Sequence, residues 1–565
     1  MTVDSTVTEP QPGTIVSLTS RVDQVYPTLT AAQLERIAAR GRTRAITEGE
    51  VLVHSGERTA QFFVVRAGRL DVVRHTPATE EVVTSFGPGM FTGEASLLSG
   101  RRGLADIRAG ASGEVIEVDR DRLLMLIQTD SELSEILMRA FILRRVELIA
   151  RGVGDVVVLG STHCQGTLRV KEFLTRNGHP YNSIDLDRDP GVQELLDRFQ
   201  IKAADIPVVI CRCEVVLRNP TNQQIADCLG FNEAIEQTHV RDVVVVGAGP
   251  AGLAAAVYAA SEGLDVLVVE STAPGGQAGT SSRIENYLGF PMGISGQELA
   301  GRAFSQAQKF GAEIMIARDA TRLNCERTPY VLEVGNGQRL SARAVIIATG
   351  AEYRKLPIAD VSRFEGAGVY YAATFMESQL CEGEDVIVVG AGNSAGQAAV
   401  FLAQTARRVH LLIRSGKLAD SMSRYLIRRI EDHPAIERHL FTEIVSLEGN
   451  GRLERVGWRD KQTGQVEQRP IRHVFTMTGA VPSTHWLGGC LAQDDKGFIK
   501  TGRDLAPDDL AAARWPLGRQ PYLLETSLPG VFAVGDVRAG SIKRAASAVG
   551  EGSIAIAAVH QVLAE

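Results

Sequence analysis

The stretch DVVVVGAGPAG (residues 242–252) carries the strongest structural signal in the chain. Four consecutive valines predict a buried strand, and Gly247, Gly249 and Gly252 follow it in G-x-G-x-x-G register. In such a turn the first glycine permits a tight bend, the second lets backbone approach a pyrophosphate, and the third lets helix and strand pack closely. The stretch therefore predicts a Rossmann-like domain with a phosphate at a helix N-terminus.

The next predicted strand, DVLVVE (265–270), supports this interpretation because it ends in Glu270, 23 residues after Gly247. A carboxylate at that place accepts hydrogen bonds from a ribose diol. The uncharged run 243–260 is long enough to span a membrane. Its three glycines and Pro250 favour a strand, a tight turn and a packed helix instead.

A second loop of the same design lies at DVIVVGAGNSAG (385–396), with alanine in the third place. The following strand ends in Arg414, where an acidic residue would mark NAD, and an arginine there suits a 2′-phosphate. NADPH is therefore predicted in preference to NADH. The predicted contacts are Gly390, Gly392, Asn393, Ser394, Ala395, Arg414 and Lys417.

A third signal is LPGVFAVGDVRAG (528–540), in which small residues lead into Gly535 and Asp536. An aspartate at a strand end beside a helix can bind the polyol hydroxyls of a flavin. The chain is thus expected to return to its first nucleotide domain after the second one ends.

Length and composition set the frame for these motifs. A chain of 565 residues needs about three to five domains. Its net charge of −7 argues against a polyanion-binding surface. Seven cysteines do not make a disulfide scaffold and predict a reducing, cytoplasmic setting. The first 20 residues lack the features of a signal peptide and are expected to be a disordered lead.

Two further regions precede the nucleotide motifs. Residues 21–150 contain a short helix, glycine-separated strands and the closing helix SELSEILMRAFILRRVELIA (131–150), which predicts a small antiparallel barrel. Residues 154–232 read as strand, helix, strand, helix and strand, an order that predicts a small α/β domain.

Residues 240–565 resemble the low-molecular-weight thioredoxin reductases through PGGQ (274–277), IENYLGFP (284–291), AVIIATGA (344–351), VVGAGNSA (388–395) and GVFAVGDV (530–537). The resemblance implies an FAD domain (240–355 and 479–565) interrupted by an NAD(P)H domain (356–478), with hydride passing from NADPH to FAD. It also suggests a homodimer. The implied FAD contacts are Gly247, Gly249, Pro250, Ala251, Gly252, Glu270, Gly275, Gln277, Asn286, Thr349, Gly350, Gly535, Asp536, Arg544 and Ala545.

The chain departs from that family at GVYYAATFMESQLC (368–381). The two redox cysteines of the family fall on Ala372 and Phe375, and the acid that follows them falls on Met376. Disulfide exchange needs a thiolate, so the usual relay is absent from its usual place. An aromatic side chain at 375 is expected to pack near the flavin instead.

The middle region resembles a glutaredoxin, since DVVVLGSTHCQGTLRVKEFL (155–174) matches the first strand, active-site turn and helix of that fold. Cys164 takes the first cysteine position, Thr167 the second, and Pro207 the place of the cis-proline. A helix N-terminus favours a thiolate. Cys164 is therefore the candidate catalytic residue, a reactive monothiol, and the alternative is a small buried side chain.

Other cysteines carry weaker signals. Cys211 and Cys213 share one face of a predicted strand, which allows a transient disulfide or no redox role, and the second is favoured. Cys381 is expected to be a packing residue, with replacement of the lost thiols as the alternative.

The N-terminal region resembles the cyclic-nucleotide-binding domain of bacterial regulators through GMFTGEASLLSGRRGLADIRA (89–109). Gly93 and Glu94 match the pair that meets phosphate and ribose. The phosphate-binding arginine falls on Gly103, and Arg101 and Arg102 lie out of register. Cyclic nucleotide binding and a structural barrel that docks or dimerises both remain open. The helix-turn-helix of a DNA-binding regulator does not follow, so DNA is not an expected partner.

The sequence thus predicts an FAD-dependent NAD(P)H oxidoreductase related to thioredoxin reductase, whose N-terminal domain regulates it, with no membrane partner. Three hypotheses differ in the electron acceptor. Electrons reach a disulfide protein through Cys164, or they pass directly to oxygen, a quinone or a small iron–sulfur protein. In the third, the protein is a cyclic-nucleotide or redox sensor with incidental turnover.

Overall fold

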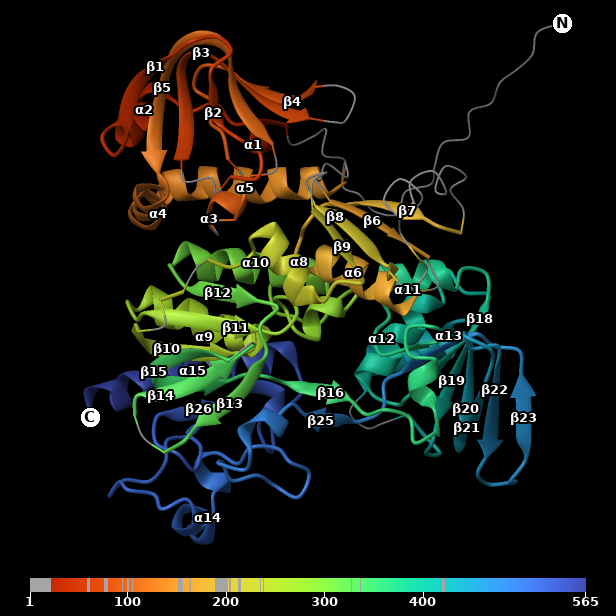
Figure 1. Cartoon of the computed structure of the whole chain (residues 1–565). Coiled ribbons are helices and arrows are strands. Elements are labelled where there is room, and N and C mark those ends of the chain that lie inside the picture. The colour runs from red at the N-terminus through yellow and green to blue at the C-terminus, as the bar shows by residue number, and fades with distance from the viewer. Residues whose placement is uncertain are drawn as a thin grey trace, which may run out of the picture. The chain divides into compact units, whose positions relative to one another are not determined.

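The computed structural model describes residues 22–565 except 58–60, 76–79, 94, 99–100, 104, 151–155, 162–163, 188–201, 203–204, 212–214, 234, 237, 327, 336 and 419–421. The expected disordered lead therefore lies outside the described residues, as does most of the helix predicted near 191–199. The chain forms two compact units, residues 1–151 and residues 152–565. Figure 1 labels the helices and strands of each unit.

The first unit is built on a five-stranded antiparallel sheet of order β1-β5-β3-β4, with β2 paired to β5. Two long strands, β3 and β5, form its spine, and α5 closes it by burying Leu133, Leu137 and Phe141. The sequence analysis missed β1 and the separate helix α4. The elements are α1 (Val22–Val25), α2 (Ala31–Ala38), β1 (Arg42–Ile46), β2 (Val51–Val53), β3 (Gln61–His75), β4 (Glu80–Phe86), α3 (Ala95–Leu98), β5 (Asp106–Asp119), α4 (Arg120–Thr129) and α5 (Ser131–Ala150).

The second unit begins with a four-stranded sheet of order β7-β6-β8-β9. Only β6 and β7 run parallel. The rings of Phe173 and Phe231 stack in its core, with their centroids 6.0 Å apart. The sequence analysis missed the last strand and helix. The elements are β6 (Val156–Gly160), α6 (Gln165–Arg176), β7 (Asn182–Asp185), β8 (Val208–Cys211), β9 (Val215–Arg218) and α8 (Asn222–Leu229).

The first nucleotide motif lies in a seven-stranded sheet of order β12-β11-β10-β15-β14-β13, with β26 paired to β15. The chain returns to this sheet near its C-terminal end, because β26 runs parallel to β15. Helices α9, α10 and α15 supply side chains to the hydrophobic core on one face. The elements are β10 (Val240–Val246), α9 (Pro250–Ser261), β11 (Val266–Glu270), α10 (Gly296–Lys309), β12 (Glu313–Ile316), β13 (Ala320–Asn324), β14 (Tyr330–Val334), β15 (Gln338–Ile347), β26 (Val531–Ala533) and α15 (Ala545–Ala564).

The second nucleotide motif lies in a parallel sheet of order β17-β24-β18-β19-β20. Helices α12 and α13 pack on one face. The small antiparallel sheet β21-β22-β23 packs on the other. Strands β16 (Ala351–Tyr353) and β25 (Ala480–Pro482) pair where the chain leaves and re-enters the first domain. The elements are β17 (Val369–Tyr370), α11 (Phe375–Leu380), β18 (Asp385–Val389), α12 (Asn393–Leu402), β19 (Arg408–Ile413), α13 (Arg424–Asp432), β20 (Ile436–Leu440), β21 (Thr442–Glu448), β22 (Arg455–Asp460), β23 (Val466–Arg469) and β24 (His473–Thr476).

Helix α15 is long and apolar enough to cross a membrane by length and composition, with a mean hydropathy of 1.2. In the structure the apolar residues of α15 are explained by packing inside the protein. Ala555, Ile556 and Val559 are fully buried in the core that α9 also lines. At Gly552 the two helices approach so closely that an added Cβ would lie 2.2 Å from the carbonyl oxygen of Ala251.

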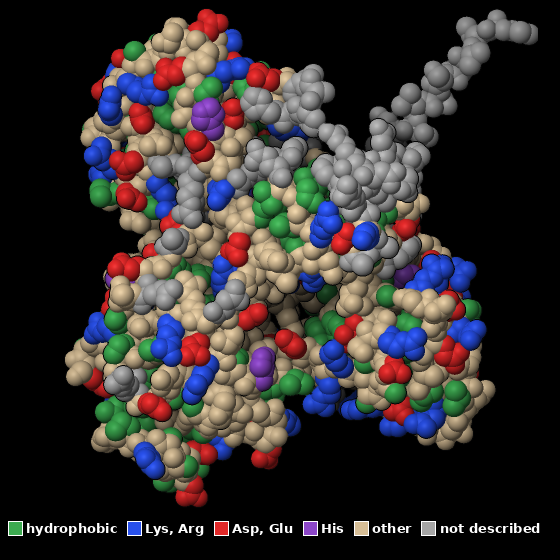
Figure 2. Space-filling model, viewed as in Figure 1, with side chains coloured by type: hydrophobic (Ala, Val, Ile, Leu, Met, Phe, Trp, Pro, Cys, Tyr) green, Lys and Arg blue, Asp and Glu red, His purple; other side chains and the backbone are tan. Residues whose placement is uncertain are grey.

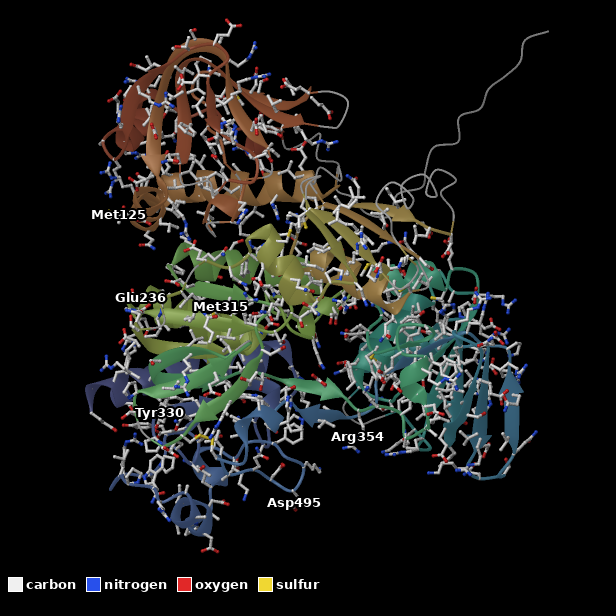
Figure 3. All side chains as sticks on the ribbon, in the orientation of Figure 1. Met125, Glu236, Met315, Tyr330, Arg354 and Asp495 are labelled. Atoms are coloured by element: carbon white, nitrogen blue, oxygen red, sulfur yellow. A yellow bond between two sulfur atoms is a disulfide. The ribbon has the colours of Figure 1, made fainter. Side chains whose placement is uncertain are left out.

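Two cysteines are joined in a way that the sequence analysis does not predict. Cys325, just after β13, forms a disulfide with Cys490, and their Cα atoms are 6.3 Å apart. Figure 3 shows it as a yellow bond near the labelled Tyr330. On the face drawn in Figure 2, basic and acidic side chains are interspersed, as expected for a net charge of −7.

The close contact at Gly552 predicts a specific stability effect. Gly552→Ala should destabilise the protein by about 1–3 kcal/mol, because the added methyl group overpacks the contact between α9 and α15. Gly550→Ala is the matched control, since an added Cβ there meets no atom within 4 Å. It should stabilise the helix by up to about 1 kcal/mol. Thermal unfolding measures both, and an equal effect of the two changes would contradict the prediction.

Candidate nucleotide and redox site

The first glycine turn has the geometry that the sequence predicts. Gly247 has φ of 104°, and a Cβ on it would lie 2.4 Å from the carbonyl oxygen of Ala348. A Cβ on Gly252 would lie 1.8 Å from the oxygen of Gly247, whereas one on Gly249 would meet nothing closer than 3.9 Å. The turn is therefore tight at its ends and open in the middle, where a pyrophosphate approaches the start of α9.

Glu270 connects this turn to the end of β11. Its carboxylate is 7% exposed and accepts hydrogen bonds from the backbone amides of Ala248 at 2.7 Å, Thr272 at 2.8 Å and Ala273 at 3.1 Å. A carboxylate has about four lone-pair positions, so one remains for a ribose hydroxyl. The residue thus fits the ribose-binding role that the sequence predicts.

The other predicted flavin contacts line the same region of the first domain. The amide of Gly275 donates to the oxygen of Ala248 at 2.7 Å, and the Thr349 hydroxyl donates to the oxygen of Ser483 at 2.9 Å. Gln277 donates through its side-chain amide to the oxygen of Ala351, in the linker strand β16. Asn286 is exposed in the loop before α10, and Gly350 has φ of 67° directly before β16.

The third motif packs against the first turn. A Cβ on Gly535 would lie 3.0 Å from the Cβ of Ala251, and the Gly535 amide donates to Glu551 at 2.7 Å. Burial raises the pKa of Asp536. Arg544 is the exposed N-cap of α15, and Ala545 is its first residue. An amide-lined turn, a buried carboxylate and an open glycine therefore fit a dinucleotide with an attached polyol.

The second turn repeats this design. A Cβ on Gly390 would lie 2.7 Å from the oxygen of Met477, and α12 begins just after Gly392. Asn393 uses its side-chain oxygen to accept from the amide of Ser423 at 2.8 Å. The buried methyl group of Ala395 takes the place of the third glycine.

The predicted phosphate-binding residues lie just after β19. Arg414 and Lys417 are both exposed there. The hydrogen bond from Arg459 is the main cause that lowers the pKa of Glu443. The charge of Arg414 makes one of the smaller contributions in the same direction. Arg414 is therefore solvent-accessible, as a side chain available to a 2′-phosphate should be, and it lies within electrostatic range of the Glu443 carboxylate.

Tyr353 links the two nucleotide domains. Burial raises the pKa of its hydroxyl, the hydrogen bond with Ser394 opposes this, and the charge of Asp536 adds to it. The side chain thus contacts the second glycine turn and lies within electrostatic range of the predicted polyol-binding carboxylate. A second link is the ion pair between Arg429 on α13 and Glu285, at 2.6 Å. Both links bring the second turn toward the predicted flavin site.

The place of the missing dithiol is a capped helix start. Thr374 is the N-cap of α11, and its amide donates to Glu377 at 2.9 Å. Ala372 is half-buried and Ala373 is buried. The expected packing of Phe375 near the flavin stays a prediction, because that side chain lies outside the described part of the structure. Ala372 and Ala373 offer no group for thiol exchange.

Cys381 does not replace the lost thiols. It is fully buried, and its sulfur donates to the oxygens of Glu377 at 3.3 Å and Ser378 at 3.5 Å. Burial, with a smaller contribution from Glu384, raises the pKa of Cys381 to about 12. The thiolate that exchange requires is therefore strongly disfavoured, and the packing alternative holds.

Cys164 is half-buried at the N-cap of α6, and Pro207 follows a cis peptide bond. A Cβ on the neighbouring Gly166 would lie 2.7 Å from Pro207 Cδ. Burial lowers the pKa of Arg169 and the charge of Cys164 opposes that shift, so the guanidinium lies within electrostatic range of the sulfur. Thr167 is fully buried.

The two cysteines of the CRC motif lie beyond this turn. Cys211 is fully buried, at the end of β8. Cys213 lies outside the described residues, so the choice between a transient disulfide and the favoured absence of a redox role stays untested.

Helix α6 lies against both nucleotide domains. At its start, a Cβ on Gly366 would lie 2.7 Å from Cγ of Gln165. Further along, Glu172 lies within electrostatic range of Glu377. Burial is the main cause that raises the pKa of Glu377, and the charge of Glu172 makes the smallest contribution. At its end, Arg176 donates to the oxygen of Gly276 at 2.9 Å. Sequence reasoning missed these contacts because they join segments about 100 to 200 residues apart.

In the first unit the predicted cassette is held by the closing helix. Arg144 on α5 donates to the oxygens of Phe91 and Gly93, each at 2.9 Å. Arg101, which lies out of register with the phosphate-binding arginine, is 7% exposed. Glu94 lies outside the described residues.

Comparisons with known proteins match two regions of the chain to known families. Residues 241–552 match the pyridine nucleotide-disulphide oxidoreductase family, and residues 43–130 match the cyclic nucleotide-binding domain. A thioredoxin reductase of Mycolicibacterium smegmatis is 34% identical over 331 residues, which cover 58% of this chain and 97% of that protein. The NADPH-dependent thioredoxin reductase 3 of Arabidopsis thaliana is 29% identical, covering 62% of this chain and 65% of its own. The crystal structure of T. acidophilum thioredoxin reductase has a TM-score of 0.51 at 28% identity, over 57% of this chain and 99% of that one.

The contacts of Glu270 predict its effect on flavin retention. Glu270→Gln places an NH₂ group against backbone N–H donors and removes charged hydrogen bonds of about 1.5–3 kcal/mol each. Affinity for FAD should fall at least about tenfold, measured as the ratio of flavin to protein absorbance after gel filtration. Glu262→Gln removes an exposed carboxylate paired to His560 and should retain flavin. Full retention in Glu270→Gln would contradict the assigned role.

Proposed function

Because this chain belongs to the pyridine nucleotide-disulphide oxidoreductase family, we propose that it passes hydride from NADPH to FAD. The reduced flavin then passes its electrons to an acceptor without using residues 372–375. It is a thioredoxin reductase-like oxidoreductase with a cyclic nucleotide-binding domain toward its N-terminal end. Members of the thioredoxin reductase-like family use FAD and NADPH, and FAD supplies the hydride-accepting ring when bound.

The observation that carries the proposal is the position of Tyr353. Its hydroxyl contacts Ser394 in the second glycine turn and feels the charge of Asp536 in the first domain. A nicotinamide nucleotide held at Gly390 and Gly392 would therefore enter on the side of the predicted flavin polyol site. Orientation of the two cofactors is the main contribution of the chain to hydride transfer.

The FAD ligands in this proposal are the first-domain residues named from the sequence. The Gly247–Gly252 turn holds the pyrophosphate, Glu270 accepts from the ribose, and Asp536 accepts from the polyol. Arg414, with Lys417 beside it, pairs with the 2′-phosphate of NADPH.

The domain limits in this proposal are 21–150, 154–232, 240–355 with 479–565, and 356–478. The strand order β7-β6-β8-β9 and the cis-proline Pro207, close to Gly166 of α6, support a thioredoxin-like fold for residues 154–232. The antiparallel strands of the first unit support a cyclic-nucleotide-binding barrel.

The proposal predicts how flavin reduction depends on the nucleotide. Under anaerobic conditions NADPH should bleach the flavin absorbance rapidly in a stopped-flow experiment. Arg414→Ala should lower kcat/KM for NADPH by about 10- to 100-fold and leave NADH unchanged, because only NADPH carries the 2′-phosphate. Arg407→Ala, an exposed arginine paired to Asp385, is the matched control. An equal loss with both nucleotides would reject the role of Arg414.

A second candidate function is disulfide reduction through Cys164. The contact of α6 with Gly366 supports it, because the thiol then stands at the helix end that faces the segment of the lost dithiol. The mechanism needs thiolate attack on an acceptor disulfide and reduction of the resulting mixed disulfide by electrons from the flavin.

This candidate predicts a separable defect. Cys164→Ser should abolish NADPH-dependent reduction of a test disulfide and leave flavin reduction by NADPH unchanged. Cys228→Ser, a half-buried cysteine of α8, is the control. If Cys164→Ser keeps full disulfide turnover, the thiol route is wrong. Rapid NADPH oxidation without any disulfide would then favour oxygen, a quinone or a small iron–sulfur protein as acceptor.

The first unit is proposed to bind a cyclic nucleotide and to regulate the reductase. Burial of Arg101 in the cassette supports a phosphate partner that differs in register from the family position at Gly103. Cyclic AMP should raise the thermal unfolding temperature of the protein and change its NADPH oxidation rate. Arg101→Ala should lose both effects and Arg102→Ala should keep them. No shift and no rate change with the unaltered protein would instead favour a structural barrel.

A further inference from the structure

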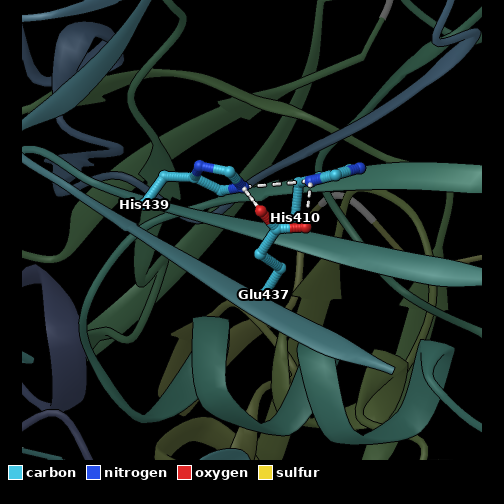
Figure 4. A group of neighbouring side chains, drawn as sticks. All are labelled: His410, Glu437 and His439. Carbon is cyan, nitrogen blue, oxygen red and sulfur yellow. Dashed lines mark hydrogen bonds and ion pairs between the residues drawn. The ribbon is translucent and has the colours of Figure 1, made fainter. Parts of the chain in front are cut away.

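Two imidazoles and a carboxylate converge on the face of the second nucleotide sheet that β22 covers (Figure 4). Strands β19 and β20 pair in parallel with His410 opposite Glu437 and Leu412 opposite His439. His410 and His439 therefore come from neighbouring strands, and Glu437 lies two residues before His439. The three side chains point toward one another in Figure 4, over the sheet surface.

The facing nitrogen and oxygen atoms of the three side chains lie close together. His410 Nδ1 lies 3.0 Å from His439 Nε2 and 3.7 Å from a carboxylate oxygen of Glu437. His439 Nε2 lies 3.6 Å from the other carboxylate oxygen. All three ligand atoms fall within 4.8 Å of one another.

The two imidazoles are enclosed by the protein. Burial lowers the pKa of both His410 and His439. The Trp458 ring packs against both, with centroids 5.4 Å from His410 and 5.2 Å from His439. Glu437 is 46% exposed, so the cluster opens to solvent on the side of this carboxylate.

We propose that His410, Glu437 and His439 bind one zinc ion, with water completing its coordination. Tetrahedral zinc with metal–ligand distances of about 2.0–2.2 Å separates its ligand atoms by about 3.3–3.6 Å. The separations of the facing atoms, 3.0, 3.7 and 3.6 Å, lie near that range. Two imidazoles and one carboxylate are also a ligand set that zinc accepts in proteins.

Metal binding requires a change in hydrogen position but no net proton release. The imidazole nitrogens that face each other now share a hydrogen. Both must offer a lone pair to the ion, so this hydrogen moves to the far nitrogen of the donating ring. The carboxylate of Glu437 then supplies the negative charge.

Two other histidine–carboxylate pairs in the described part of the chain provide a contrast. His239 pairs with Asp265 at 2.6 Å and His560 pairs with Glu262 at 2.8 Å, each through one largely exposed imidazole. Neither brings a second imidazole to the same point. A bound ion at His410, Glu437 and His439 would connect β19 to β20 directly, and β19 leads into Arg414.

Isothermal titration of the chelator-treated, FAD-loaded protein with zinc chloride tests the proposal. The unaltered protein should bind one equivalent and unfold at a higher temperature with zinc. His439→Gln should weaken binding by about 100-fold or more, and Glu437→Gln by about 10-fold or more. His560→Gln should bind as the unaltered protein does.

Two results would overturn the proposal. One is the absence of zinc binding by the unaltered protein. The other is unchanged stoichiometry and affinity in both variants, which would assign the ion to cysteine thiolates elsewhere. If His439→Gln fails to fold, judged by circular dichroism and flavin content, the exposed Glu437→Gln decides alone, because its removal leaves the buried rings in place.

Discussion

The close approach of α9 to β10 at Gly252 is the contact on which the rest of the second unit depends. A side chain there would lie 1.8 Å from the oxygen of Gly247, so the helix can reach the strand only without one. This approach aims the free amides of the helix N-terminus at the space beside Gly249. It also lets Glu270 bind the amide of Ala248 at 2.7 Å and lets Gly535 pack on Ala251.

Helix α9 also makes the contact that brings the C-terminal end of the chain back to the first sheet. Helix α15 packs on α9 at Gly552. The face of the sheet that α9 covers is therefore fully buried only once β26 and α15 are in place. The second nucleotide domain is inserted between β16 and β25, whose pairing brings the two connecting segments together. Tyr353 on β16 then meets Ser394, which couples the insertion to the flavin side of the first domain.

Without the dithiol, electrons would have to pass from a bound flavin to an acceptor by another route. Thr374 and Glu377 cap α11 where the family carries its cysteines, and burial makes Cys381 unreactive. Helix α6 meets both nucleotide domains, through Gln165 at one end and Arg176 at the other. A thiol-bearing domain thus lies beside the segment that lost its own thiols, which is the reason to test Cys164 first.

The sequence alone determined the two nucleotide turns, because glycine spacing and strand patterns are local properties of the chain. The order of the cofactors stays a prediction that rests on the family resemblance, which also revealed the missing thiols. The sequence also predicted the cis-proline segment and α5. Only the tertiary structure decided how distant segments meet: the Cys325–Cys490 disulfide, the contact of Gly366 with α6, and the cluster of His410, Glu437 and His439. Short elements such as β1, β9 and α8 were missed for a related reason. Their stability comes from pairing and burial against residues far along the chain, which local patterns do not encode.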